Sequence, residues 1–286
     1  MISDLALPLV MGVLLGGLYA MIALGLSLVF GVMKLMNLAH GDFIILSSFL
    51  AFAMSSSFGF DPILSLLIII PLFFGMGMLI QRYLLNRAFR ISMEAPLIIT
   101  IGISLIIQNL CQIIWSPASR ALSSFYALKT FEIGPINIPL VYLLDFFAAL
   151  VTMLALREFL KRTYLGRAIT ASSQHEKAAL MVGIDTTRIY VFTFALATGI
   201  AAISGVFFGL TFSFSPSSGV NLLILAFGVV IMGGLGSMLG TFLSGVVFGL
   251  SQTLGGYFLG TTAQWLVTFV IVLIILAIRP RGIFTR

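Results

Sequence analysis

Charged residues are scarce in this sequence. Only 8% of its 286 residues are Asp, Glu, Lys or Arg, whereas 60% are hydrophobic and the mean hydropathy is +1.18. Soluble domains carry about 25% charged residues and about 45–50% apolar ones. The composition therefore excludes a soluble enzyme or binding domain and indicates an integral membrane protein.

Cysteine, histidine and the common catalytic motifs are also rare or missing. The single cysteine, Cys111, excludes a disulfide within the chain. His40 and Asp42 stand two positions apart, but no third metal ligand lies close to them in the sequence. No GxSxG, HExxH or GxxxxGK[ST] pattern occurs. We therefore expect no metal, no cofactor, no catalytic residue and no ATPase site in this chain.

The apolar residues form continuous runs, which argues against a transmembrane β-barrel. A helix of roughly 20 apolar residues crosses a bilayer. We therefore expect an all-α fold, a single polytopic transmembrane helical bundle over residues 1–286 with about eight or nine spans. The candidate spans are about 7–31, 40–56, 62–80, 95–115, 139–156, 189–211, 221–235, 238–257 and 263–278.

Basic residues gather in three polar segments, at 82–90, 157–188 and 279–286. Under the positive-inside rule all three segments are cytoplasmic. This orientation puts the N-terminus outside and the C-terminus in the cytoplasm. The loops expected on the outside are 57–61, 116–138 and 212–219.

Glycines four residues apart recur along the apolar runs. Such pairs let helix backbones approach closely, so they predict tight packing inside the bundle, with a dimer interface as the alternative. The pairs are Gly12/Gly16, Gly205/Gly209, Gly245/Gly249 and Gly256/Gly260.

A short polar block, Asn37-Leu38-Ala39-His40-Gly41-Asp42, separates the first two apolar runs. One interpretation is a helix boundary at the membrane surface, where polar residues solvate a turn. The other is a break in a helix that lines a transport path, because broken helices bring polar groups next to a solute. The second is slightly favoured, and it makes Asn37, His40, Gly41 and Asp42 candidate residues of a solute path.

A glycine cluster interrupts the C-terminal third of the chain. The stretch 221–257 is too long for one helix and contains Gly233-Gly234-Leu235-Gly236-Ser237. We expect a broken, Gly-rich helix pair that meets at this turn. The turn is either a packing hinge or part of a gate, and the second interpretation adds Gly233, Gly234 and Gly236 to the solute path.

The long polar segment 157–188 is expected to hold a short helix at 174–182. Ser173 and Glu176 have the spacing of a capping box. Gly183 suits the position just beyond a helix end, and Asp185 suits the N-cap of the next span.

This short helix has two possible roles. Ala178, Ala179 and Met181 are expected to form a small, partly apolar face. The helix either lies on lipid headgroups or docks into a groove of a cytoplasmic partner. The residues alone do not decide between the two.

Four runs together resemble the permeases of branched-chain amino-acid ABC importers. GLSLVFGVMKLMNLAHGD at 25–42 is similar to that family's pattern GLxLxFGVMxxxNxAHGE, and further similar runs lie at 166–188, 233–240 and 279–284. The likeness covers nearly the whole chain, in the same order. Two positions depart from the pattern, because Asp42 and Lys177 stand where the family usually has Glu.

The resemblance implies a permease subunit that moves branched-chain or similar small amino acids inward, driven by ATP hydrolysis on partner subunits. The implied partners are a second related permease, two cytoplasmic ATPases and an extracytoplasmic solute-binding protein, with no nucleic acid. The implied location is the bacterial inner membrane. The residues implied to couple to the ATPase are Ser173, Glu176, Lys177, Ala178, Ala179 and Gly183. They lie in the segment 157–188, which is called the coupling segment below.

Two questions stay open at this point. The family also carries urea, short amides and other small acids, so the motifs do not identify the solute. The alternative function is a stand-alone channel or an ion-coupled carrier, with His40 and Asp42 as a proton or ion relay.

Overall fold

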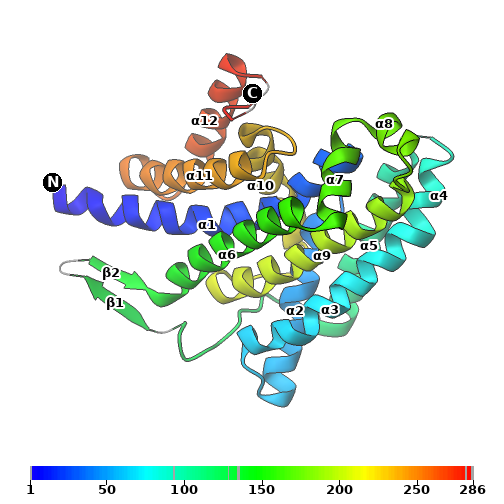
Figure 1. Cartoon of the computed structure of the whole chain (residues 1–286). Coiled ribbons are helices and arrows are strands. Elements are labelled where there is room, and N and C mark those ends of the chain that lie inside the picture. The colour runs from blue at the N-terminus through cyan, green and yellow to red at the C-terminus, as the bar shows by residue number, and fades with distance from the viewer. Residues whose placement is uncertain (1, 93, 128, 134–135, 281, 285–286) are drawn as a thin grey trace.

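The computed structural model describes residues 2–92, 94–127, 129–133, 136–280 and 282–284. These residues form an α-helical bundle with one small β-hairpin (Figure 1). Seven of the helices are long and apolar enough to cross a membrane, and two shorter apolar helices lie near the C-terminus. The predicted fold class is confirmed, and the expected eight or nine spans correspond to these seven long and two short helices.

The helix boundaries follow the predicted spans closely, and the span at 95–115 is matched at both ends. The long helices are α1 (Ile2–Met33), α2 (His40–Phe58), α3 (Pro62–Ile80), α5 (Ala95–Trp115), α6 (Leu140–Arg162), α9 (Thr186–Thr211) and α11 (Met238–Leu259). The shorter elements are η1 (Gln81–Leu85, a π-helix that continues α3), α4 (Asn86–Phe89), α7 (Tyr164–Gln174), α8 (Glu176–Met181), α10 (Ser218–Gly233) and α12 (Gln264–Ile278). Strand β1 (Thr130–Ile133) pairs antiparallel with β2 (Ile136–Pro139), with Thr130 opposite Pro139.

Helix α1 is the centre of the bundle, since 89% of its most apolar stretch is buried. It packs against α11 (Figure 1), and glycines allow the close approach. A Cβ on Gly16 would lie 2.4 Å from Val246 Cα, and one on Gly249 would lie 2.3 Å from the Gly12 carbonyl oxygen. A Cβ on Gly205 would likewise lie 2.1 Å from the Ile44 carbonyl oxygen, so α9 and α2 meet in the same way.

The packing prediction is confirmed for these glycines but is wrong for Gly260. That residue lies beyond the end of α11 in a left-handed conformation, and a Cβ built on it meets no atom within 4 Å. The four-residue spacing is misleading there because the helix ends between the two glycines.

One end of the bundle, here called the basic end, holds α4, α7 and α8 (Figure 1), and η1 leads directly into α4. The glycine turn between α10 and α11 lies at the C-terminal end of α1, because Gly236 packs on Gly31. The Ile283 N–H also donates to the Met232 carbonyl at 2.9 Å, which brings the chain back beside this turn. Helices α10, α11 and α12 therefore alternate in direction between the two ends. Arg281 and Arg286 of the predicted basic tail lie outside the described residues.

The opposite end gathers the loops that follow α2, α5 and α9. Arg120 and Phe214 form a β-bridge, and the Tyr126 hydroxyl donates to Asp61 at 3.1 Å. Burial raises the pKa of Tyr126 to about 12. Each end of the bundle thus collects loops that the charge pattern assigns to a single side of the membrane.

The predicted capping box at Ser173 and Glu176 does not form, and that prediction is wrong. Ser173 lies inside α7, where its hydroxyl donates to the Thr170 carbonyl at 2.7 Å. His175 occupies the N-cap position of α8 without a side-chain cap. The reason lies upstream, because Thr163 caps α7 by accepting the Gly166 N–H at 2.9 Å, and the helix then runs through Ser173. The predicted helix at 174–182 is a helix break at His175 followed by the short α8.

Candidate functional site

The polar block is reached by a sharp reversal of the chain at the end of α1. Lys34 has a left-handed backbone with φ of +52°, and the chain then returns along the bundle. His40 Nε2 donates to the Ile22 carbonyl at 2.9 Å. Ile22 precedes Met33 by eleven residues (33 − 22), or about 16 Å of helix. Helix α2 therefore starts well inside the bundle, roughly two-thirds of the way along α1.

Each polar side chain of this block has a partner on another element or in the block itself. The Asn37 side chain accepts the Ala39 N–H at 3.1 Å. Asp42 accepts from the Gln108 amide of α5 at 3.0 Å, although only 2% of the Asp42 surface is exposed. A Cβ on Gly41 would lie 1.9 Å from the Gly219 carbonyl oxygen at the start of α10. The block thus joins α1, α2, α5 and α10 at one buried point.

The glycine turn of the predicted solute path lies elsewhere. Gly234 and Gly236 both have positive φ, +91° and +84°, which favours glycine. A Cβ on Gly236 would lie 2.8 Å from Gly31 Cα, and one on Gly233 would lie 2.6 Å from the Gly240 backbone. The structure brings Asn37, His40, Gly41 and Asp42 together, but it places the glycine turn apart from them, at the basic end.

A cavity of about 330 Å³ lies between α1, α10, α11, α12 and the segment after α9. This volume falls at the lower end of the range for small-molecule sites, about 300–1,000 Å³. The Tyr19 hydroxyl donates to the Gln252 carbonyl at its edge. The polar side chains on its wall are Tyr19, Ser213, Ser218, Asn221, Gln252, Gln264 and Trp265.

Sequence reasoning missed this cavity. Tyr19 and Gln252 are 233 positions apart; Tyr19 lies in an apolar run, and Gln252 lies between Ser251 and Thr253. The Gln252 amide inside a predicted span could have indicated the cavity, because polar side chains in membrane helices usually face the bundle interior or a water-filled cavity.

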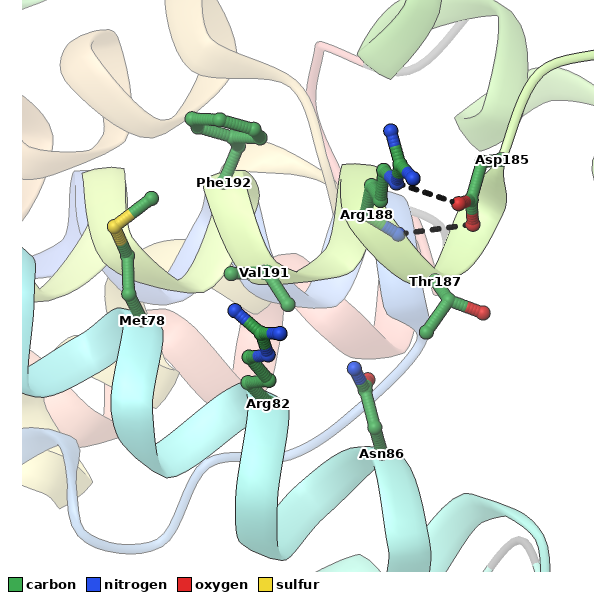
Figure 2. Close-up of a pocket in the computed structure, with 8 residues that line it drawn as sticks. All are labelled: Met78, Arg82, Asn86, Asp185, Thr187, Arg188, Val191 and Phe192. Atoms are coloured by element: carbon green, nitrogen blue, oxygen red, sulfur yellow. Dashed lines mark hydrogen bonds and ion pairs between the residues drawn. The ribbon is translucent and has the colours of Figure 1, made fainter.

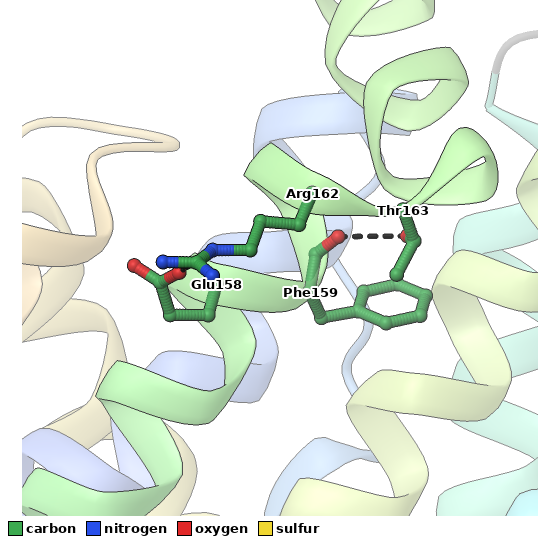
Figure 3. A network of polar contacts seen from close by, with 4 residues as sticks. All are labelled: Glu158, Phe159, Arg162 and Thr163. Carbon is green, nitrogen blue, oxygen red and sulfur yellow. Dashed lines mark hydrogen bonds and ion pairs between the residues drawn. The ribbon is translucent and has the colours of Figure 1, made fainter.

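The coupling segment starts with a tight turn from α6 into α7. The Thr163 hydroxyl donates to the Phe159 carbonyl at 2.7 Å, as Figure 3 shows. Beside it, Arg162 pairs with Glu158 one helical turn away at 2.5 Å. Both ionic groups of this pair are largely exposed, so it contributes little to stability. Thr163 thus bonds to the last turn of α6 through Phe159 and to the first turn of α7 through Gly166, which fixes the angle between the two helices.

Helix α8 presents an apolar tip, here defined as Leu180, Met181 and Val182, and its three residues are 53%, 86% and 76% exposed. Glu176, Lys177 and Ala178 are exposed as well. Ala179 is 4% exposed, so the predicted face of Ala178, Ala179 and Met181 is wrong for its central member.

The C-terminus of α8 is closed as predicted. Gly183 has φ of +84°, and its N–H donates to the Leu180 carbonyl at 3.1 Å. The Ile184 N–H donates to the Ala179 carbonyl at 3.0 Å, which completes a Schellman motif. Asp185 then caps α9 by accepting the Arg188 N–H at 3.2 Å. The apolar tip is therefore exposed but held in a fixed backbone.

A second hollow of about 470 Å³ lies at the basic end, between the end of α3 with η1 and the start of α9 (Figure 2). Arg188 pairs with Asp185 at 2.9 Å, and Figure 2 shows the Arg82 guanidinium next to Val191 of α9. The Asn86 carbonyl accepts the Gln81 amide at 2.9 Å. This hollow adds positive charge next to the segment that carries the apolar tip.

Comparisons with known proteins agree over nearly the full chain. Residues 9–278 match the family described as the branched-chain amino acid transport system permease component. The high-affinity branched-chain amino acid transport system permease protein LivH of Salmonella typhimurium is 28% identical, over 96% of this chain and 94% of its own length.

BraD of Pseudomonas aeruginosa, described in the same words, is 28% identical over 97% of this chain and 95% of its own. The fructose import permease protein FrcC of Rhizobium meliloti is 26% identical over 85% of this chain and 69% of its own. No solved structure matches significantly.

Proposed function

The chain belongs to the family of branched-chain amino acid transport system permease components, and from that premise we propose which solute it moves, in which direction and with which partners. It is a multi-pass membrane protein and a permease component of an ABC transport system. We propose that it imports branched-chain or similar small amino acids across a bacterial inner membrane. The family match over 9–278, together with seven membrane-length helices, carries this proposal.

The proposed partners are a second related permease, two cytoplasmic ATPase subunits and an extracytoplasmic solute-binding protein. The chain carries no Walker A pattern, so ATP hydrolysis is assigned to the ATPase partners. The whole chain acts as one transmembrane domain with its N-terminus outside and its C-terminus in the cytoplasm. The three basic segments support this orientation.

The coupling segment is proposed to dock into the ATPase. An apolar tip held by a Schellman motif suits insertion into a groove on another protein. Glu176, Lys177 and Ala178 would contact the partner beside the tip. Ser173, Ala179 and Gly183 would act through the shape of the segment, because they hold α7 and α8 in place.

The solute path is proposed to pass beside the polar block, where Asn37, His40, Gly41 and Asp42 fix the meeting point of four helices. Gly233, Gly234 and Gly236 would form a flexible point at the cytoplasmic mouth, since Gly234 and Gly236 have positive φ and Gly236 packs on Gly31 of α1 through backbone atoms. A polar junction inside a membrane bundle is costly to bury, and that cost is the physical support for a role in transport.

Reconstitution tests the proposal. The chain, co-expressed with a second permease and the ATPase subunits, should support ATP-driven uptake of leucine into proteoliposomes in the presence of the binding protein. Competition with fructose and urea at equal concentration should leave leucine uptake unchanged. Gradient-driven uptake by this chain alone, without ATP, would instead favour a channel or secondary carrier.

A further inference from the structure

Helix α5 lies at the edge of the bundle and exposes two chemically different sides. Only 17% of its most apolar stretch is buried. One exposed side is aliphatic and consists of Ile106, Leu110, Ile113 and Ile114. On another side Ser104, Gln108 and Gln112 follow one another at four-residue spacing, with Asn109 and the exposed Ile101 and Leu105 next to them. We call the four polar residues the α5 polar side.

Helix α3 is the natural comparison, because it also lies at the edge of the bundle. Its strongly exposed large side chains are aliphatic and suit lipid, for example Leu64, Leu67 and Leu72. Its one serine, Ser65, is buried and donates to the Pro62 carbonyl at 2.6 Å. A peripheral helix of this bundle therefore does not need exposed amides.

The amides of α5 are only partly satisfied within the chain. Gln108 donates to Asp42 and Ser104, and Asn109 donates to the Leu105 carbonyl at 2.7 Å. Within the described residues the Gln112 side chain has no hydrogen-bond partner. A side-chain amide facing hydrocarbon loses hydrogen bonds to water, which costs several kcal/mol. The exposed amides of the α5 polar side therefore suit water or another protein better than hydrocarbon.

The α5 polar side is also where the buried polar block approaches the surface. Asp42 lies in the interior, but its partner Gln108 is half-buried on α5. A solute on this side of α5 would meet amide groups first, with the Asp42 carboxylate one hydrogen bond behind them.

We propose that the α5 polar side lines the solute path and that Gln112 and Gln108 contact the passing amino acid. The second permease subunit forms the opposite wall. Amide N–H groups donate to the solute carboxylate and amide carbonyls accept from its ammonium group. Neutral amides bind a zwitterion more weakly than charged pairs would, so the solute is released readily. This inference rests on the proposed function for the identity of the solute.

Thiol accessibility tests the proposal in the assembled transporter. In a Cys111→Ser background, Ser104→Cys and Gln112→Cys are compared with Ile106→Cys and Ile113→Cys, which lie at similar depths on the aliphatic side. A membrane-impermeant, charged methanethiosulfonate is added to proteoliposomes. We expect the first pair to react at least tenfold faster than the second, and leucine with the binding protein to slow that reaction.

Equal, slow labelling of all four variants, with ATP-driven uptake intact, would overturn the path and indicate a dry interface. Fast labelling that no amount of leucine slows would overturn the solute contact. If the assembly with the unsubstituted chain takes up no amino acid, the proposed function fails, while the labelling pattern still reports the water-filled side. A Gln112→Leu variant completes the test, because it should raise KM for leucine about tenfold with little change in maximal rate. An unchanged KM would contradict the contact.

Discussion

The polar block and the α8 tip are both short interruptions between long apolar helices, yet their environments are opposite. The block is buried, its side chains bond to other parts of the chain, and it joins four helices. The tip leaves Met181 86% exposed and depends on its own backbone for order. If the tip docks on a partner as proposed, mutations there should impair assembly and transport, whereas mutations in the polar block should impair folding of the chain itself.

The largest effect is expected from a side chain at Gly41. A Cβ there would lie 1.9 Å from a backbone oxygen of α10, so Gly41→Val requires helix α10 to move. Overpacking of this kind costs about 1–3 kcal/mol or more. We expect little monodisperse protein after size-exclusion chromatography. Gly75→Ala in α3 is the matched control, because its Cβ meets no atom within 4 Å, and its yield and melting temperature should be unchanged or higher.

The next effect separates docking from folding at α8. Met181→Glu should leave the melting temperature unchanged but reduce ATPase co-purification and uptake at least tenfold, because a charge replaces an apolar contact. Ala179→Arg forces a charged chain into a buried position, so it should lower the melting temperature as well. If Met181→Glu binds the ATPase normally, the tip has no docking role.

A smaller effect is expected when the charge of the polar block is removed and its shape is kept. Asp42→Asn retains an acceptor oxygen for Gln108 but replaces a charge-assisted bond with a neutral one. The free energy of unfolding should fall by about 1 kcal/mol. We expect leucine uptake to fall about tenfold while assembly with the ATPase is retained. Unchanged uptake kinetics would limit Asp42 to a structural role.

The smallest effect concerns the backbone of the coupling segment. Gly183→Ala places a Cβ on a residue with φ of +84°, which costs roughly 1–2 kcal/mol. The segment lies at the surface, so the strain should loosen α8 locally and reduce uptake a few-fold. Hydrogen–deuterium exchange of residues 176–184 should increase in this variant. Unaltered exchange there would show that the Schellman motif does not hold the tip.

Much of the fold was predictable because the length of an apolar run in the sequence identifies a membrane helix. The α5 boundaries matched at both ends, and the glycine turn between α10 and α11 was located correctly. Local signals failed where an upstream signal competed. Thr163 caps α7, and α7 then continues through Ser173, so the predicted capping box at Ser173 and Glu176 does not form. The different start of α8 also changes which of its residues are exposed.

The depth of the polar block could not be predicted from sequence. Local patterns fit a turn at the membrane surface almost as well as a break inside the bundle. The position is set by the chain after Lys34, which returns along α1 until His40 reaches the Ile22 carbonyl. The α5 polar side was also missed, although the spacing of Ser104, Gln108 and Gln112 was visible. The spacing indicates an exposed polar side only once α5 is known to lie at the edge of the bundle.

The central claim is that this chain is a permease whose apolar tip engages an ATPase while its polar block stays internal. Photo-crosslinking in membranes tests this most directly, with a benzophenone amino acid at position 181 in the co-expressed transporter. The account predicts a covalent adduct between this chain and the ATPase subunit, and no such adduct from a benzophenone at position 91, an exposed apolar residue beyond α4. Adducts at position 181 with lipid alone would contradict it.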